Sequence, residues 1–269
     1  TSRDRQLRTA HLRFAEQALK VLCRDRTGGH WDRLKVHLRA RVIDGTEPML
    51  GRLWLMRHLH QVDAVRYGPD PILTVAEARR IVQECLAAPP GRDRSIAGAT
   101  MWELGWWRAL DDEAARQVAE RLITWIPDMG SDEIYGIEQA VTALDSWNKQ
   151  ALETVGTNVA PEVLARVVSE HVDARWGNEW GQLILRIMHA SGLDEAEWGT
   201  RFEDALDIDD YVARLSEGAA DALWGFVDLV HALSGLLPGL GARCIRAASP
   251  TIVQQLETDM PAAASSLVD

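Results

Sequence analysis

The sequence predicts an all-α fold, built as an α-solenoid of HEAT- or TPR-like helix pairs. Three observations predict it: helical periodicity along most of the 269 residues, no segment of alternating apolar and polar positions, and a weak repeat in the second half. The first part of the chain could instead form a separate N-terminal helical bundle. A composition of 46% hydrophobic and 26% charged residues is that of a folded protein.

Helix signals occur along the whole chain. Residues 7–22 place Leu7, Phe14 and Leu22 on one apolar stripe. Thr74 and Glu77 have the spacing of a capping box, which predicts a helix that starts there and ends at Pro89-Pro90-Gly91. That helix should carry Val75, Ala78, Val82 and Leu86 on its buried side. Residues 180–188 carry the clearest stripe: Trp180, Leu183, Ile184, Ile187 and Met188. Ser249-Pro250 predicts a further helix start.

The second half of the chain resembles itself at a spacing of 44 residues. Trp180-Gly181 leads to His189-Ala190-Ser191-Gly192, and Trp224-Gly225 leads to a similar segment that starts at His231. One more step of about this length back from Trp180 reaches Tyr135-Gly136-Ile137. Periods near this length are typical of two-helix repeats, because one helix pair cannot bury its apolar face without a neighbour.

The charge is unevenly distributed. Residues 1–110 contain 19 Lys+Arg and 12 Asp+Glu, which gives +7, whereas residues 111–269 contain 10 and 28, which gives −18. The segment from Ala87 to Ser95, rich in Pro, Gly and Arg, is the best candidate boundary. We therefore expect a basic N-terminal helical region at 1–90 and an acidic helical-repeat region at 91–269. Different partners for the two ends, or an electrostatic contact between them, would each explain the split.

Two groups of residues are candidates for binding a partner protein. Trp102, Trp106 and Trp107 form a cluster in a chain with 11 Trp, and tryptophan offers a large contact area with little loss of entropy. Core packing between helices is the alternative for most of these tryptophans. Arg33 and Arg41, with His37 between them, are spaced to share one helical face that could contact an acidic surface. A solvated face is the alternative there.

Nothing in the sequence indicates catalysis, a metal or a cofactor, so we expect no catalytic residue, no metal ligand and no cofactor. The motifs GxxxxGK, GxGxxG, HExxH and GxSxG are absent. His58 and His60 have the wrong spacing for a helical chelate, and the acidic groups at Asp111 and Asp207 have the positions of helix caps.

The remaining properties of the sequence concern the partners and the cellular location of the protein. A net charge of −11 disfavours nucleic acid as a partner, and the most apolar stretch, 222–242, is interrupted by Asp228 and His231, so no membrane span is expected. Three widely spaced cysteines without a CxxC pair favour buried thiols in a reducing cytoplasm. The first residues contain no initiator Met and no apolar signal core, so we expect the chain to be a fragment of a longer protein.

Residues 160–257 resemble the degenerate helical repeats at the C-terminal ends of bacterial STAND-type NTPases and related conflict-system proteins of bacterial defence. The match consists of Leu164-Ala165-Arg166, a short acidic turn, and a Trp-Gly helix that ends in His-Ala-Ser-Gly. The resemblance implies that the chain is the sensor end of a larger protein, with ATP hydrolysis in a separate domain.

Together these observations predict a non-catalytic protein-binding, sensor or scaffold module of a larger multidomain protein. Its partner would be another protein or an adjacent domain of the same polypeptide. Two alternatives stay open: a helical enzyme with a Trp-lined pocket for a small ligand, and an acidic inhibitor or immunity-type protein that binds a basic partner.

Overall fold

The computed structural model describes residues 30–60, 73–106, 110–171 and 177–207, and the short pieces 230–231, 239, 241–243, 245–250 and 253–254. Within these residues every regular element is an α-helix or a 3-10 turn. The all-α prediction is therefore confirmed for the part of the chain that the structure describes.

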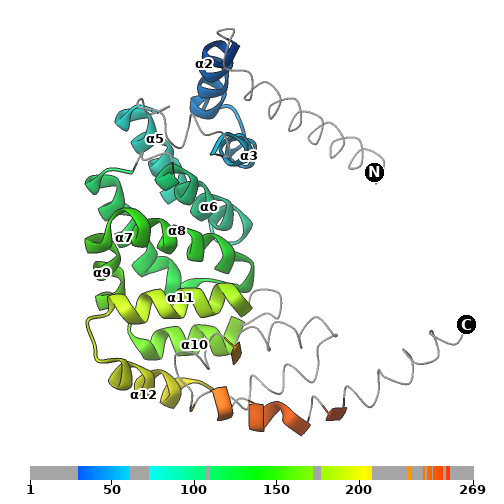
Figure 1. The fold of residues 1–269 in the computed structure, drawn as a ribbon, viewed down its shortest axis with the longest axis vertical. Helices are drawn as coiled ribbons and strands as arrows, with labels where there is room; N and C mark the ends of the chain where they lie inside the picture. Colours follow the sequence, from blue (N-terminus) through cyan, green and yellow to red (C-terminus); the bar gives the residue numbers. More distant parts are fainter. Residues whose placement is uncertain are drawn as a thin grey trace, which may run out of the picture.

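The helices follow one another along an elongated stack, from α2 at one end to α12 at the other (Figure 1). In chain order they are α2 (His30–Ile43), α3 (Met49–His60), α5 (Val75–Leu86), α6 (Arg92–Trp106), α7 (Asp112–Trp125), the 3-10 turns η1 (Ile126–Asp128) and η2 (Ser131–Glu133), α8 (Ile134–Trp147), α9 (Lys149–Asn158), α10 (Pro161–His171), α11 (Gly177–Ala190) and α12 (Glu195–Ala205).

Helices that are not consecutive in the chain pack side by side in two rows. In one row α6 packs against α3 and α8, and α8 packs against α11; in the other, α7 packs against α5 and α9. Consecutive helices such as α5 and α6, or α7 and α8, join the two rows. Apolar side chains from both rows form one continuous buried cluster, which runs from Val42 to Phe202 and beyond. Each helix therefore buries its apolar face against the helices before and after it in the stack.

The helices of the second row start at a fixed interval. The helices α5, α7 and α9 begin 37 residues apart (75 to 112 and 112 to 149). Each is preceded by a polar N-cap: the side chains of Thr74, Asp111 and Asn148 accept hydrogen bonds from the backbone N–H groups three residues later. These bonds satisfy donors that a helix start otherwise leaves unpaired. The capping box at Thr74 and the cap at Asp111, both predicted from sequence, are confirmed.

Two glycines set the contact between α6 and α8. A Cβ atom added to Gly98 would lie 2.0 Å from the backbone oxygen of Gly136, and one added to Gly136 would lie 2.1 Å from the backbone oxygen of Ser95. No real Cβ atom is tolerated at such distances, so the two helices touch backbone to backbone only because both positions are glycine.

Polar pairs connect helices across the stack at separations of 32 to 48 residues in sequence. They include Arg79–Asp111, Arg39–Glu77, Arg201–Glu162 and Arg186–Glu138. Separations of this size correspond to one helix pair, so these bonds connect equivalent parts of successive pairs.

The turn between α5 and α6 is held by a buried ion pair. Arg94 and Glu133 are 5% and 2% exposed, and Arg94 Nη1 lies 2.9 Å from Glu133 Oε2. The backbone N–H of Gly91 donates to the other oxygen of the same carboxylate. Gly91 has a φ of 91°, a conformation in which glycine is strongly preferred. This turn lies in the segment predicted as a boundary; the division at residue 90 stays a prediction, and α5 packs against α7 across it.

Other sequence-based expectations have mixed outcomes. All five residues of the Trp180–Met188 stripe are buried in α11, as predicted. Val75 is 52% exposed, so its predicted place on the buried face is wrong. Ser249-Pro250 does not start a helix, because 245–250 is already helical and the Ser249 hydroxyl donates to the Ile245 carbonyl.

The repeat motifs are described only in part. Tyr135-Gly136-Ile137 and Trp180-Gly181 lie near the starts of α8 and α11, which pack side by side. The segment 7–22 and Trp224-Gly225 lie outside the described residues. The HEAT- or TPR-like solenoid stays a prediction.

Candidate functional site

A chain of three tryptophans lies where α6 and α8 end. Trp102 and Trp106 are one helical turn apart on α6 and meet edge to face, with ring centroids 5.6 Å apart. Trp147, the last residue of α8, lies 6.5 Å from Trp106 at an interplanar angle of 70°. Trp102 and Trp106 are half-buried, and Trp147 is 39% exposed. We call these three residues the tryptophan cluster; Trp107, also predicted as a binding residue, lies outside the described residues.

Local packing positions this cluster. A Cβ atom on Gly105 would lie 2.6 Å from the Trp147 ring, so the indole lies directly on the glycine backbone. The close contact between α6 and α8 at Gly98 and Gly136 brings the C-terminal ends of the two helices together. Trp147, which was not predicted as a binding residue, is therefore part of the candidate site, and Gly105 allows its close approach.

A buried polar network adjoins the tryptophan cluster. Glu103, which follows Trp102 in the chain, is 1% exposed and lies 3.4 Å from Nε of Arg57. The same arginine donates a 2.8 Å hydrogen bond to the Tyr135 hydroxyl. One arginine of α3 thus joins α6 and α8. Removing the arginine from a buried carboxylate that is paired in this way is strongly destabilising, so this contact helps to hold the helices together.

Three further tryptophans of the described helices are core residues. Trp125, Trp180 and Trp198 are each at most 2% exposed. Trp198 stacks on Phe202 with ring centroids 5.1 Å apart. Trp125, which the sequence places one helix after the cluster, contacts Arg94 and Arg121. The core-packing interpretation is confirmed for these three residues.

The predicted basic face lies on α2, at the far end of the stack from α12 (Figure 1). Arg33, His37 and Arg41 are all exposed on this helix, as their spacing predicts. Arg41 Nη2 lies 2.5 Å from Glu47 Oε2, so part of its charge is already compensated. This face and the tryptophan cluster are on different helices, and the structure does not bring them into one site.

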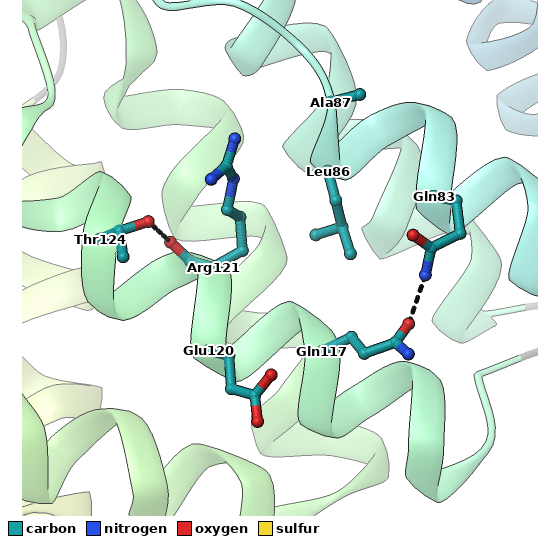
Figure 2. A pocket seen from close by; sticks show the side chains of 7 residues that line it. All are labelled: Gln83, Leu86, Ala87, Gln117, Glu120, Arg121 and Thr124. Carbon is teal, nitrogen blue, oxygen red and sulfur yellow. Dashed lines mark hydrogen bonds between the residues drawn. The ribbon is translucent and has the colours of Figure 1, made fainter.

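A second surface feature is the groove between α5 and α7 (Figure 2). It has a volume of about 550 Å³ and is open to solvent. Its walls are Gln83, Leu86, Ala87, Gln117, Glu120, Arg121 and Thr124. The Gln83 side chain donates to the Gln117 amide oxygen and so connects the two walls at one end. None of these residues was predicted to bind a partner, because the polar ones lie on an exposed helical face that carries no distinguishing pattern and Leu86 was expected on the buried side of its helix.

Cys85 is a buried thiol and not an activated nucleophile. Burial raises the pKa of the Cys85 thiol to about 12, so it stays protonated near neutral pH. Hydrogen bonds from arginine lower the pKa values of Glu77, Asp111 and Glu162. Among the described residues no group of three or more His, Cys, Asp or Glu could hold a metal ion. No described helix is long and apolar enough to span a membrane.

No protein-family model, no curated protein and no solved structure matches the chain. The resemblance to the sensor ends of STAND-type NTPases therefore stays a prediction.

Proposed function

We propose that the chain is a non-catalytic protein-binding module, an α-solenoid that acts as the sensor or scaffold part of a larger multidomain protein. The observation that carries this proposal is the partly exposed tryptophan cluster of Trp102, Trp106 and Trp147. Large exposed aromatic residues cost free energy in water, and in protein interfaces they supply much of the binding energy.

The shape of the stack supports the same proposal. Because helices pack mainly on their neighbours in the two rows, the described part of the chain is elongated. An elongated stack exposes a large surface for its number of residues. An elongated helical surface suits an extended protein partner. The paired state of the buried carboxylates Glu103, Glu133 and Glu138 gives them a structural role.

The test uses a binding partner captured from the source cells and then purified. Trp147→Ala should weaken its affinity by roughly tenfold or more, because central aromatic residues in interfaces often contribute about 2 kcal/mol. Leu50→Ala is the matched control, since Leu50 is 48% exposed and lies on α3, away from the cluster. Titration calorimetry gives the affinities, and circular dichroism melting shows that both variants fold. Equal affinities for Trp147→Ala and the wild type would exclude the cluster from the interface.

The same assay tests the basic face of α2. The double variant Arg33→Glu/Arg41→Glu should weaken partner binding without unfolding the chain, because both side chains are exposed. A strongly basic partner whose affinity falls steeply with salt would instead support the acidic-inhibitor alternative.

A further inference from the structure

Arg121 is the distinctive residue of the groove between α5 and α7. Figure 2 shows its side chain and that of Leu86 extending into the same space from the two facing helices. Within the described residues, no carboxylate pairs with the Arg121 guanidinium and no side chain accepts a hydrogen bond from it. Most arginines that point across the stack, such as Arg79, are paired with an acid. The groove therefore holds a cation that has no carboxylate partner among the described residues.

The Arg121 guanidinium lies against a buried aromatic ring of the core. Its guanidinium carbon lies 5.7 Å from the centroid of the Trp125 ring. Trp125 is 2% exposed, and its ring also lies 5.3 Å from the guanidinium of Arg94, which Glu133 holds in the buried ion pair. A rigid aromatic platform under a guanidinium restricts its motion without using its hydrogen-bond donors.

The other groups of the groove do not compensate this charge. Glu120 also lines the groove, but Arg116 Nη1 pairs with its carboxylate, which in Figure 2 points away from Leu86. Gln83 and Gln117 are neutral, and Gln117 also donates to Glu113 over 2.6 Å. The two ionisable groups that line the groove, Glu120 and Arg121, have opposite charges, but the Glu120 carboxylate pairs with Arg116 and not with Arg121. Beside Arg121, Leu86 offers an apolar contact.

We propose that this groove binds a glutamate or aspartate side chain of a partner protein, within an extended segment that also presents an aliphatic residue. Arg121 donates two parallel hydrogen bonds to the carboxylate, a geometry for which its planar donor fork is suited. Leu86 contacts the aliphatic neighbour, and the amides of Gln83 and Gln117 are placed to bond the backbone of the segment. The open form of the groove fits a chain that lies along the surface.

This site goes beyond the proposed function, since it lies between α5 and α7 and contains no residue of the tryptophan cluster. The experiment uses a fluorescein-labelled peptide with blocked ends, Leu-Glu-Leu flanked by glycines, and its Leu-Gln-Leu counterpart. Fluorescence anisotropy at low salt should show saturable binding of the glutamate peptide to the wild-type chain at concentrations below about 1 mM. The glutamine peptide should bind roughly tenfold more weakly, because its amide cannot take part in an ion pair.

The protein variants sharpen the test. Arg121→Gln should weaken binding of the glutamate peptide by roughly tenfold. Arg166→Gln changes an exposed arginine of α10 outside the groove. It should change the affinity for the glutamate peptide by less than about twofold. Melting curves for the two variants should coincide with that of the wild type.

Three results would overturn the proposal: no binding of the glutamate peptide, equal binding of both peptides, or equal loss in Arg121→Gln and Arg166→Gln. Trp147→Ala should bind the glutamate peptide as the wild type does, so failure of this site and failure of the tryptophan cluster are distinguishable.

Discussion

The contact between α6 and α8 joins neighbouring helices of one row, and the contact between α5 and α7 joins neighbouring helices of the other row. The two contacts differ in how closely the helices approach each other. Between α6 and α8, glycines at 98 and 136 allow the backbones to touch, and the residues around them are buried. Between α5 and α7, Gln83 and Gln117 meet at the surface and the groove stays open next to them.

The difference shows how side-chain size decides whether two stacked helices seal or leave a binding surface. Without side chains at the crossing, α6 and α8 exclude solvent along their contact, which holds the ends of both helices and the tryptophan cluster in place. Between α5 and α7, the long side chains of Gln83 and Gln117 meet, and a groove with both polar and apolar walls lies beside them. The close contact is therefore expected to provide stability and the open one to provide recognition.

The largest expected effect concerns the ion pairs of the two regions. Arg94→Ala leaves the buried carboxylate of Glu133 without its cation and should lower the free energy of unfolding by about 3–5 kcal/mol. Arg79→Ala removes an exposed arginine from its pair with Asp111 and should have a much smaller effect. Urea denaturation of both variants gives the two values. Similar losses of unfolding free energy in Arg94→Ala and Arg79→Ala would show that the buried and the exposed ion pair contribute equally to stability.

A somewhat smaller effect is expected from closing the space at the glycine contact. Gly136→Ala should destabilise the chain by about 1–3 kcal/mol, because the new methyl group would meet the backbone of Ser95 and force α6 and α8 apart. Gly130→Ala is the control: its φ of −93° suits alanine and nothing lies within 4 Å of the added Cβ. The control should be neutral or slightly stabilising in the same denaturation assay. A stable Gly136→Ala chain would contradict the backbone contact.

The smallest expected effect is the pH dependence at the open contact. The hydrogen bond from Arg79 lowers the pKa of Asp111 in the folded chain. A carboxyl group with a lower pKa in the folded state contributes stability that is fully present above its ordinary pKa, near 4, and is lost as the pH falls through the folded value. Asp111→Asn keeps an N-cap side chain but removes the charge.

Melting temperatures of the wild type and of Asp111→Asn should therefore differ at neutral pH. The two should converge as the solution becomes more acidic than about pH 4. If the difference between the two melting temperatures stays constant down to about pH 2, the Arg79–Asp111 ion pair does not contribute to the pH dependence of stability.

Much of the fold could be predicted from local sequence. The caps at Thr74 and Asp111 and the stripe from Trp180 to Met188 are local patterns, and each forms the expected element. The interval of 37 residues between Thr74, Asp111 and Asn148 is also visible in the sequence. The predicted repeat rests on Trp-Gly pairs 44 residues apart instead, a spacing close to the 42 and 43 residues that separate the starts of α6, α8 and α11 in the other row, and so it does not include this interval.

The candidate sites were less predictable. Trp102 and Trp106 were chosen for their residue type and spacing, but nothing in the sequence adds Trp147 to them, because 41 residues separate it from Trp106. The preceding Asp145 and Ser146 and the following Asn148 are polar, which is a weak signal that this tryptophan lies near the surface. Arg121 differs from other exposed arginines only in what surrounds it.

The sequence by itself determined that the chain is helical, where several helices begin, and which side of α11 is buried. These properties depend on residues within about one or two turns of each other, so spacing and caps are enough to predict them. The tertiary structure alone decided that Gly98 meets Gly136, that Glu133 lies buried beside Arg94, and that Arg121 lines a groove without a carboxylate partner among the described residues. Such contacts join residues a helix pair apart, and their energies depend on burial and on the distances between backbones, which no local pattern specifies.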